Sequence, residues 1–167
     1  MKGPDVSLKH LQRALTMELT TINTYMYQER KLDDWGIDRL AARMREEVAE
    51  EREHADSFLT RLLFLDGKAD MQTLGDIDSP DSVRKIFQTQ LEMEREAQSF
   101  YAKAADECRE AGDLGTFELF MRILKDEEEH IDFVEEQFDL LEMLGDQLYL
   151  ARQVSSVSHE SDEDEVP

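Results

Sequence analysis

Two Glu-x-x-His motifs and two isolated glutamates are the residues of this chain whose types and spacing point most directly to chemistry. The motifs lie 76 positions apart, and the same offset separates the two isolated glutamates. Carboxylate oxygens and imidazole nitrogens together suit iron or manganese. We therefore predict a dinuclear metal site, with iron as the expected metal. Its six ligands would be Glu18, Glu51, His54, Glu94, Glu127 and His130.

The repetition distinguishes this pattern from a chance motif. A single Glu-x-x-His in a charged helix is common, since residues three apart on a helix often make simple surface contacts. Here all six residues are expected on core-facing positions, where unpaired carboxylates would be costly or would take up protons. Two divalent cations would remove that conflict. One Glu from each of two helices plus Glu-x-x-His from each of the other two is the dimetal arrangement of helical bundles.

The expected roles of the ligands fall into pairs. Glu18 and Glu94 would each bind one metal ion, and each motif histidine would add a nitrogen ligand to one of the two ions. The two motif glutamates would bridge the two metal ions. Open positions would remain for dioxygen or peroxide. Tyr25 and Tyr101, also 76 apart, are expected to pack with a polar tip; a hydrogen bond to a ligand glutamate, or donation of an electron, is the alternative. The acidic residues that precede the bridging glutamates are expected to be solvated; they are Glu50 and Asp126.

Four long helices are needed to bring these residues together. Apolar residues recur at spacings of three and four over residues 5–34, 38–65 and 82–111, and from beyond Asp113 to Gly145, the signature of helices with one buried face. Between the second and third helices, residues 66–81 could reach about 50 Å if extended, and Ser79 or Asp81 is expected to cap the next helix. We predict an all-α, ferritin-like four-helix bundle with this long crossover and a short fifth helix over 146–154.

Composition limits the class of protein further. The 167 residues predict one domain over 1–154 and a mobile acidic tail over 155–167, which has five acids between Glu160 and Glu165. A net charge of −21 argues against nucleic-acid binding and suits a protein that attracts cations. Cys108 is the only cysteine, which fits a reducing cytoplasm. The sequence has no apolar run of membrane-spanning length and no apolar signal core at its start, so no membrane association is expected and the cytoplasm is the expected location.

Several further features accompany the six residues: the Met-Lys-Gly start, Trp35-Gly36, and the stretches from Glu51 to Asp56, from Arg61 to Gly67 and from Asp126 to Asp132. In these features the sequence resembles the bacterioferritins, over about residues 1–154. This resemblance implies that the six residues are ferroxidase ligands that hold two iron ions per subunit. It also implies oxidation of Fe(II) by dioxygen or hydrogen peroxide, storage of a ferric mineral in a shell of about 24 subunits, and a ferredoxin-type reductant for release.

One departure from that family concerns haem. Bacterioferritins usually bind haem b through a methionine two residues before the first motif histidine, and here that position is Arg52. A guanidinium does not ordinarily ligate haem iron, and Met44 is more than two helical turns away. Haem b is therefore not expected in a homo-oligomer of this chain. Coassembly with a haem-binding bacterioferritin subunit that carries the methionine would restore some haem sites.

Two other functions compete with iron storage. A rubrerythrin-like dimetal protein could scavenge peroxide without storing iron, but the Cys-x-x-Cys pairs of a rubredoxin-type domain are absent. A structural helical protein could hold zinc or manganese for stability alone. The complete set of six ligands argues against this second alternative, although residue types by themselves do not identify the metal.

Overall fold

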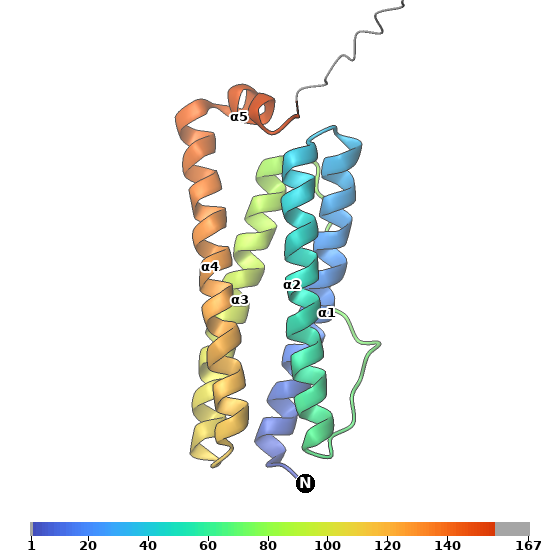
Figure 1. Cartoon of the computed structure of the whole chain (residues 1–167), viewed down its shortest axis with the longest axis vertical. Helices are drawn as coiled ribbons and strands as arrows, with labels where there is room; N and C mark the ends of the chain where they lie inside the picture. The colour runs from blue at the N-terminus through green and yellow to red at the C-terminus, as the bar shows by residue number, and fades with distance from the viewer. Residues whose placement is uncertain (1, 156–167) are drawn as a thin grey trace, which may run out of the picture.

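The helical periodicity of the sequence is realised in five helices. The structure is a computed structural model that describes residues 2–155. Over these residues it has no strand, and four long helices form a bundle with the short fifth helix across one end (Figure 1). This confirms the predicted fold class. The helices are α1 (Asp5–Asp34), α2 (Asp38–Phe64), α3 (Val83–Glu110), α4 (Leu114–Leu144) and α5 (Asp146–Arg152).

The ends of the helices follow local backbone chemistry. Gly36 and Gly112 lie between the paired helices with φ angles of +77° and +78°, a left-handed conformation that glycine adopts at little cost. The prediction that Ser79 or Asp81 caps α3 was wrong. Ser82 is the cap, and its hydroxyl accepts a hydrogen bond from the backbone N–H of Lys85 at 3.2 Å.

The long connection between α2 and α3 runs the length of the bundle, as predicted, and it lies along α1 (Figure 1). Three contacts follow one another along α1. The side-chain amide of Gln12 donates to the backbone carbonyl of Asp70, the hydroxyl of Thr20 accepts from the backbone of Gly75, and Tyr27 is hydrogen-bonded to Ser79. The crossover makes α1 and α3 run in opposite directions, which brings the two Glu-x-x-His helices, α2 and α4, onto one face.

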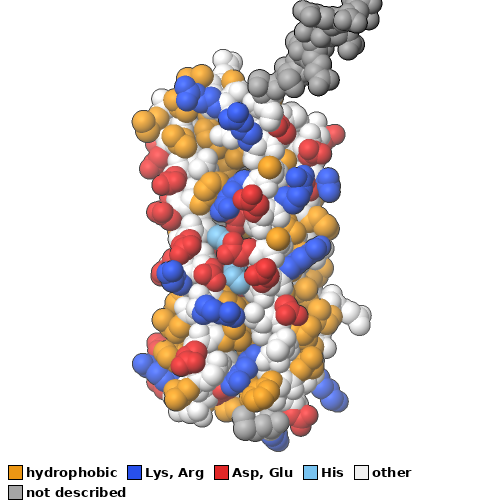
Figure 2. Space-filling model, viewed as in Figure 1, with side chains coloured by type: hydrophobic (Ala, Val, Ile, Leu, Met, Phe, Trp, Pro, Cys, Tyr) orange, Lys and Arg blue, Asp and Glu red, His pale blue; other side chains and the backbone are white. Residues whose placement is uncertain are grey.

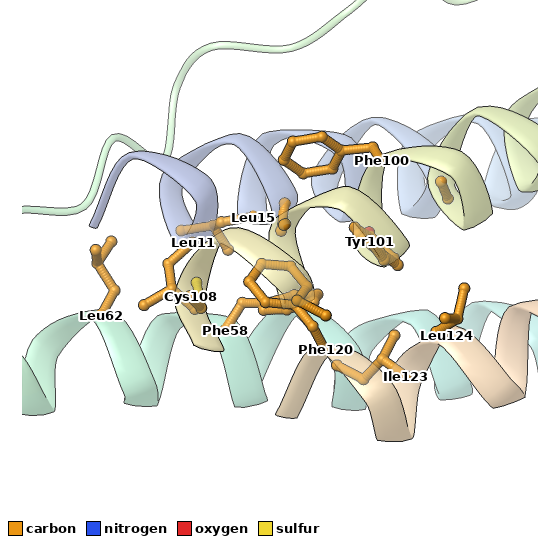
Figure 3. Packing of buried hydrophobic residues seen from close by; sticks show 14 of the residues in the cluster. Leu11, Leu15, Phe58, Leu62, Phe100, Tyr101, Cys108, Phe120, Ile123 and Leu124 are labelled. Atoms are coloured by element: carbon orange, nitrogen blue, oxygen red, sulfur yellow. The ribbon is translucent and has the colours of Figure 1, made fainter. Parts of the chain in front are cut away.

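The apolar core is divided into two clusters. One lies towards the start of α1 and includes Phe58 and Phe120, whose ring centroids are 5.1 Å apart (Figure 3). The other lies towards α5 and includes Met44 and Phe87. On α2, α3 and α4 the predicted ligands lie between the two clusters in sequence, and on α1 Glu18 lies between Leu15 and Ile22 of the first cluster. The ligands therefore form a polar layer with apolar side chains on both sides.

The fifth helix and the end of the described chain close one end of the bundle. The α5 helix stops at Arg152, two residues earlier than predicted. The backbone N–H of Ser155 then donates to the Asp38 carboxylate at 2.7 Å. Apart from Ser155, the predicted acidic tail lies outside the described residues. Among residues 2–155, no helix combines the length and the low polarity that a membrane span needs.

Candidate metal centre

The bundle brings all six predicted ligands into one buried layer. Each of the four long helices contributes a glutamate, and α2 and α4 also contribute a histidine one turn later. Every one of the six side chains belongs to a residue that is at most 5% exposed. Their ligand atoms fall into two groups of four in which all atoms lie within 4.8 Å of one another. The two groups share both motif glutamates.

The two histidines point their Nδ1 atoms into the carboxylate cluster. His54 Nδ1 lies 3.2 Å from Glu51 Oε2 and 3.5 Å from Glu127 Oε1. His130 Nδ1 lies 3.3 Å from Glu51 Oε1 and 3.7 Å from Glu127 Oε2. Each motif glutamate therefore presents one oxygen to each histidine, which is the arrangement that a bridging carboxylate requires.

The other two glutamates each belong to one side of the cluster. Glu18 Oε1 lies 4.0 Å from His54 Nδ1, and Glu94 Oε1 lies 3.7 Å from His130 Nδ1. Glu18 joins only the group that contains His54, and Glu94 joins only the group that contains His130. This division matches the positions expected of terminal ligands, one for each of two metal ions.

Two buried tyrosines are hydrogen-bonded to Glu18 and Glu94 across the interface between the helix pairs. Tyr101 on α3 donates a hydrogen bond to Glu18 Oε1 on α1 at 2.5 Å, and Tyr25 on α1 donates to Glu94 Oε1 on α3. The expected packing role is confirmed, since both tyrosines belong to the apolar core, and the alternative of a hydrogen bond to a ligand glutamate is found as well. Each hydroxyl therefore helps to fix the orientation of the carboxylate that it contacts.

A second group of carboxylates lies around the outward edges of the histidine rings. His130 Nε2 is 2.8 Å from Glu47 Oε2 and 3.3 Å from Glu50 Oε2, and His54 Nε2 is 3.4 Å from Asp126 Oδ2. Figure 2 shows histidine side chains in the middle of this face of the molecule, surrounded by acidic ones. Glu50 and Asp126 are partly exposed, as expected for solvated residues, but they also contact the histidines.

Glu47 was missed by the reasoning from sequence. It is 5% exposed and lies one turn before Glu51 on α2. The position 76 residues later is Ile123, so the internal repetition that marked the other six residues did not mark this one. A signal was nevertheless present, because Glu47 lies four residues before Glu51 and seven before His54, a spacing that places all three on one side of a helix.

Burial and charge together set the protonation of the metal-free cluster. Burial, followed by the charge of Glu51, raises the pKa of Glu18, and burial followed by the charges of neighbouring glutamates raises that of Glu127. Burial acts to raise the pKa of Glu51 as well, but the imidazoles of His130 and His54 outweigh it and lower that pKa. The carboxylates in turn raise the pKa of both histidines against the effect of burial.

The cluster has the chemistry of a metal site rather than of a closed hydrogen-bond network. Among residues 2–155, Glu51 Oε1 and Glu127 Oε1 are buried carboxylate oxygens without a hydrogen-bond partner. Such atoms are costly to bury in a protein interior. Two cations, each surrounded by three carboxylates and one imidazole, would satisfy them, and this mixed oxygen and nitrogen set suits iron or manganese.

Binding of a metal ion is expected to release protons. Because the pKa values of Glu18, Glu127 and both histidines are raised, the metal-free site retains protons near pH 7, and a cation must displace them. We expect about one or two protons per Zn²⁺ bound, and an affinity that rises with pH. Titration in weakly buffered indicator dye measures the release. Zinc binding without proton release, or an affinity independent of pH between 6 and 8, would contradict the protonated cluster.

Comparison with known proteins agrees with the fold and the site. Residues 8–144 match the ferritin family model, described as a ferritin-like domain. The fold and the buried cluster thus define a ferritin-like protein of the kind that carries a dinuclear site. A bacterioferritin of Brucella melitensis biotype 1 is 38% identical over 149 residues, which cover 89% of this chain and 92% of the relative. The chain belongs to the bacterioferritins, a family of iron-storage proteins.

Solved structures of the family superimpose closely on this chain. Mycobacterium tuberculosis bacterioferritin BfrA gives a TM-score of 0.91 at 37% identity and covers 93% of this chain and 98% of that one. Rhodobacter capsulatus bacterioferritin gives 0.92 at 35% identity and covers 95% and 99%. The Rhodobacter structure is described as having a metal-free dinuclear site and haem iron in a crystallographic special position.

Proposed function

We propose that this chain is an iron-storage ferroxidase. It would oxidise Fe(II) to Fe(III) with dioxygen or hydrogen peroxide and store the product as a ferric mineral inside a shell of about 24 subunits. The observation that carries the proposal is the pair of four-ligand groups that share two glutamates, buried in a chain that belongs to the bacterioferritins. Two Fe(II) ions held side by side can supply two electrons to one oxidant.

The proposed roles of the side chains follow from their contacts. Glu51 and Glu127 would bridge the two iron ions, since each presents one oxygen towards each histidine. Glu18 and Glu94 would be terminal ligands oriented by the tyrosine hydroxyls. The histidines and the carboxylates with raised pKa would give up their protons when Fe(II) enters. These roles assign the site to Glu18, Glu51, His54, Glu94, Glu127 and His130.

The face formed by α2 and α4 would attract the substrate cation. Glu47, Glu50 and Asp126 surround the outward nitrogens of the histidines. Because Glu47 is buried and the other two are partly exposed, negative charge continues from solvent to the ligand layer. A divalent cation is drawn along such a gradient, while anions are repelled.

We also propose that a homo-oligomer of this chain holds no haem b. Arg52 is exposed on α2 and offers no thioether. Met44 is 3% exposed, and its sulfur accepts a hydrogen bond from the Gln90 amide at 2.9 Å. Met44 is therefore a buried core residue and does not reach the surface where haem would bind. Haem would then enter only by coassembly with a subunit that carries the methionine. A cytoplasmic location and a ferredoxin-type reductant for iron release belong to the same proposal.

Aerobic addition of Fe(II) to metal-free, assembled protein tests the function. We expect a fast phase of oxidation, followed by stopped-flow absorbance, that saturates at about two Fe(II) per subunit. Later additions should accumulate as soluble ferric iron that sediments with a shell-sized particle. Fast oxidation without accumulation would instead favour a dimetal oxidase or peroxide scavenger. Oxidation no faster than in buffer would exclude a ferroxidase, and zinc that resists exchange would then indicate a structural site.

A further inference from the structure

The two sides of the candidate metal centre differ in what lies against the outward edge of the histidine ring. His54 Nε2 is 3.4 Å from Asp126, whose side chain is 33% exposed. The counterpart of Asp126 in the internal repetition is Glu50, which is also partly exposed and lies 3.3 Å from His130 Nε2. On this side, however, the buried carboxylate of Glu47 is closer still, at 2.8 Å. Glu47 is therefore the feature that makes the two sides unequal.

Glu47 is itself held by Arg43, one turn earlier on α2. The Arg43 guanidinium forms an ion pair with Glu47 Oε1, while Glu47 Oε2 faces His130. The same guanidinium lies 3.3 Å from Glu46 Oε2 and 4.8 Å from the ring centroid of Phe133 on α4. An arginine that pairs with carboxylates and stacks on an aromatic ring loses much of its freedom to move. Arg43 therefore spans α2 and α4 and restrains the carboxylate beside His130.

The internal repetition does not reproduce this arrangement beside His54. The three residues that correspond to Arg43, Glu47 and Phe133 carry no charge and no aromatic ring; they are Leu119, Ile123 and Ser57. The restrained carboxylate thus belongs to one histidine only, among the pairs of residues that the repetition relates.

A carboxylate at the outer nitrogen of a metal-binding imidazole fixes the ring and makes its inner nitrogen a stronger ligand. The inner nitrogen of His130 is Nδ1, which points into the carboxylate cluster. In the metal-free site, the contact between His130 Nε2 and Glu47 is close but not aligned as a hydrogen bond. When a cation binds Nδ1, the ring keeps its proton on Nε2, where Glu47 is placed to accept it.

We propose that Arg43 is a positioning residue that acts through Glu47 on His130 and makes the two metal positions unequal. The ion on the His130 side is bound more tightly, and the ion on the His54 side exchanges more readily. This inference rests on the proposed function, because it concerns the same centre. The His54 position is then the one that gives up its ion first.

Charge and position predict opposite effects for the loss of Arg43. A guanidinium repels a nearby cation, so its removal would tighten metal binding if only its charge mattered. If Arg43 restrains Glu47, its removal lets the carboxylate turn away and weakens binding on the His130 side. Loss of a group that supports a metal ligand typically costs roughly 10–100-fold in affinity. We expect about tenfold for Arg43→Ala, the lower end of that range, because Glu47 itself remains.

Titration of metal-free, assembled, full-length protein with Co²⁺, followed by visible absorbance, measures both positions. We expect two steps in wild type, with dissociation constants at least about tenfold apart. Arg43→Ala should weaken the tighter step about tenfold and leave the weaker step within about twofold. Arg43→Lys should restore most of the lost affinity, since lysine can still pair with Glu47 although it lacks the planar fork.

The matched control for the titration is Arg45→Ala. Arg45 is an exposed arginine on the same helix, and it also pairs with a buried carboxylate, Glu29 on α1, at 2.5 Å. The control removes the same charge without releasing a carboxylate beside a histidine, so it should not weaken either step.

The location of the tighter ion is tested on wild-type protein, which does not depend on the folding of a variant. Crystals are prepared with about one Co²⁺ per subunit, half of the number that a dinuclear site holds. Anomalous scattering should then place most of the cobalt beside His130.

The outcomes separate this inference from the function on which it rests. Two equal steps in wild type, or cobalt mainly beside His54, overturns the inequality. An Arg43→Ala protein with native helix content that binds Co²⁺ as tightly as wild type, or equal weakening by Arg45→Ala, overturns the positioning role. None of these results affects the ferroxidase proposal, which requires that two ions bind and that Fe(II) is oxidised quickly in the wild-type protein.

Discussion

Replacing Glu51 with alanine is expected to remove fast Fe(II) oxidation. Glu51 lies 3.2 Å from His54 through one oxygen and 3.3 Å from His130 through the other, so its loss opens both proposed metal positions at once. Changes to groups that only support a metal ligand typically cost 10–100-fold in affinity or activity. Loss of a bridging ligand should exceed that range, and we expect a rate at least about a hundredfold lower.

The Glu51→Ala measurement needs a readout that separates metal binding from folding. Stopped-flow absorbance gives the oxidation rate, and titration with Co²⁺ gives the number of ions bound. Glu53→Ala is the matched control, because Glu53 lies two residues later on the same helix and is exposed. It should behave as wild type. A Glu51→Ala protein with native helix content and particle size that still oxidises about two Fe(II) per subunit quickly would remove Glu51 from the centre.

The extent to which the sequence specified this fold can be traced to two regularities. Apolar spacing predicted the four long helices because each helix buries one continuous face. Most of the predicted helix ends differ from the observed ends by one residue or less. The length of the segment between α2 and α3 predicted the crossover, since only a long connection can return to the other end of the bundle. The cap of α3 was misplaced because Ser79, Asp81 and Ser82 all have suitable side chains, and packing around the helix end decides among them.

The candidate site was predictable where the sequence repeats itself and not where it departs from repetition. Glu51 and His54 were found because the same residue types recur 76 positions later, at Glu127 and His130. Glu47 was missed because its counterpart is an isoleucine. Neither helix alone shows that Glu47 reaches the outer edge of His130, since this contact joins α2 to α4 and depends on how the two helix pairs meet.

The tyrosines illustrate the same limit. Tyr25 and Tyr101 lie on the apolar stripes of α1 and α3, and a packing role accounts for that position fully. Their hydroxyls reach Glu94 and Glu18 only because the two helices run in opposite directions past each other. That direction comes from the crossover, so the hydrogen bonds are a consequence of topology rather than of any local motif. From the sequence alone, these hydrogen bonds could be proposed only as an alternative to a packing role.

Replacing Arg52 with methionine is expected to give a homo-oligomer that binds haem b. Arg52 is exposed on α2, and it has no ion-pair partner among residues 2–155, so the substitution breaks no described contact. A thioether is a soft ligand that haem iron accepts, whereas a guanidinium is a permanently charged donor of hydrogen bonds. If the facing subunit supplies the same residue, haem content should rise from almost none to about one per two subunits.

The haem measurement is the pyridine haemochrome spectrum of protein purified from cells supplied with haem precursor. Glu53→Met is the matched control, because it places a methionine at the next exposed position of α2, turned about 100° around the helix axis. That variant should remain free of haem. Fe(II) oxidation should be unchanged in Arg52→Met, since position 52 is exposed while Glu51 and His54 are buried. Haem in the wild-type homo-oligomer, or none in Arg52→Met, would show that residue 52 does not control haem binding in this chain.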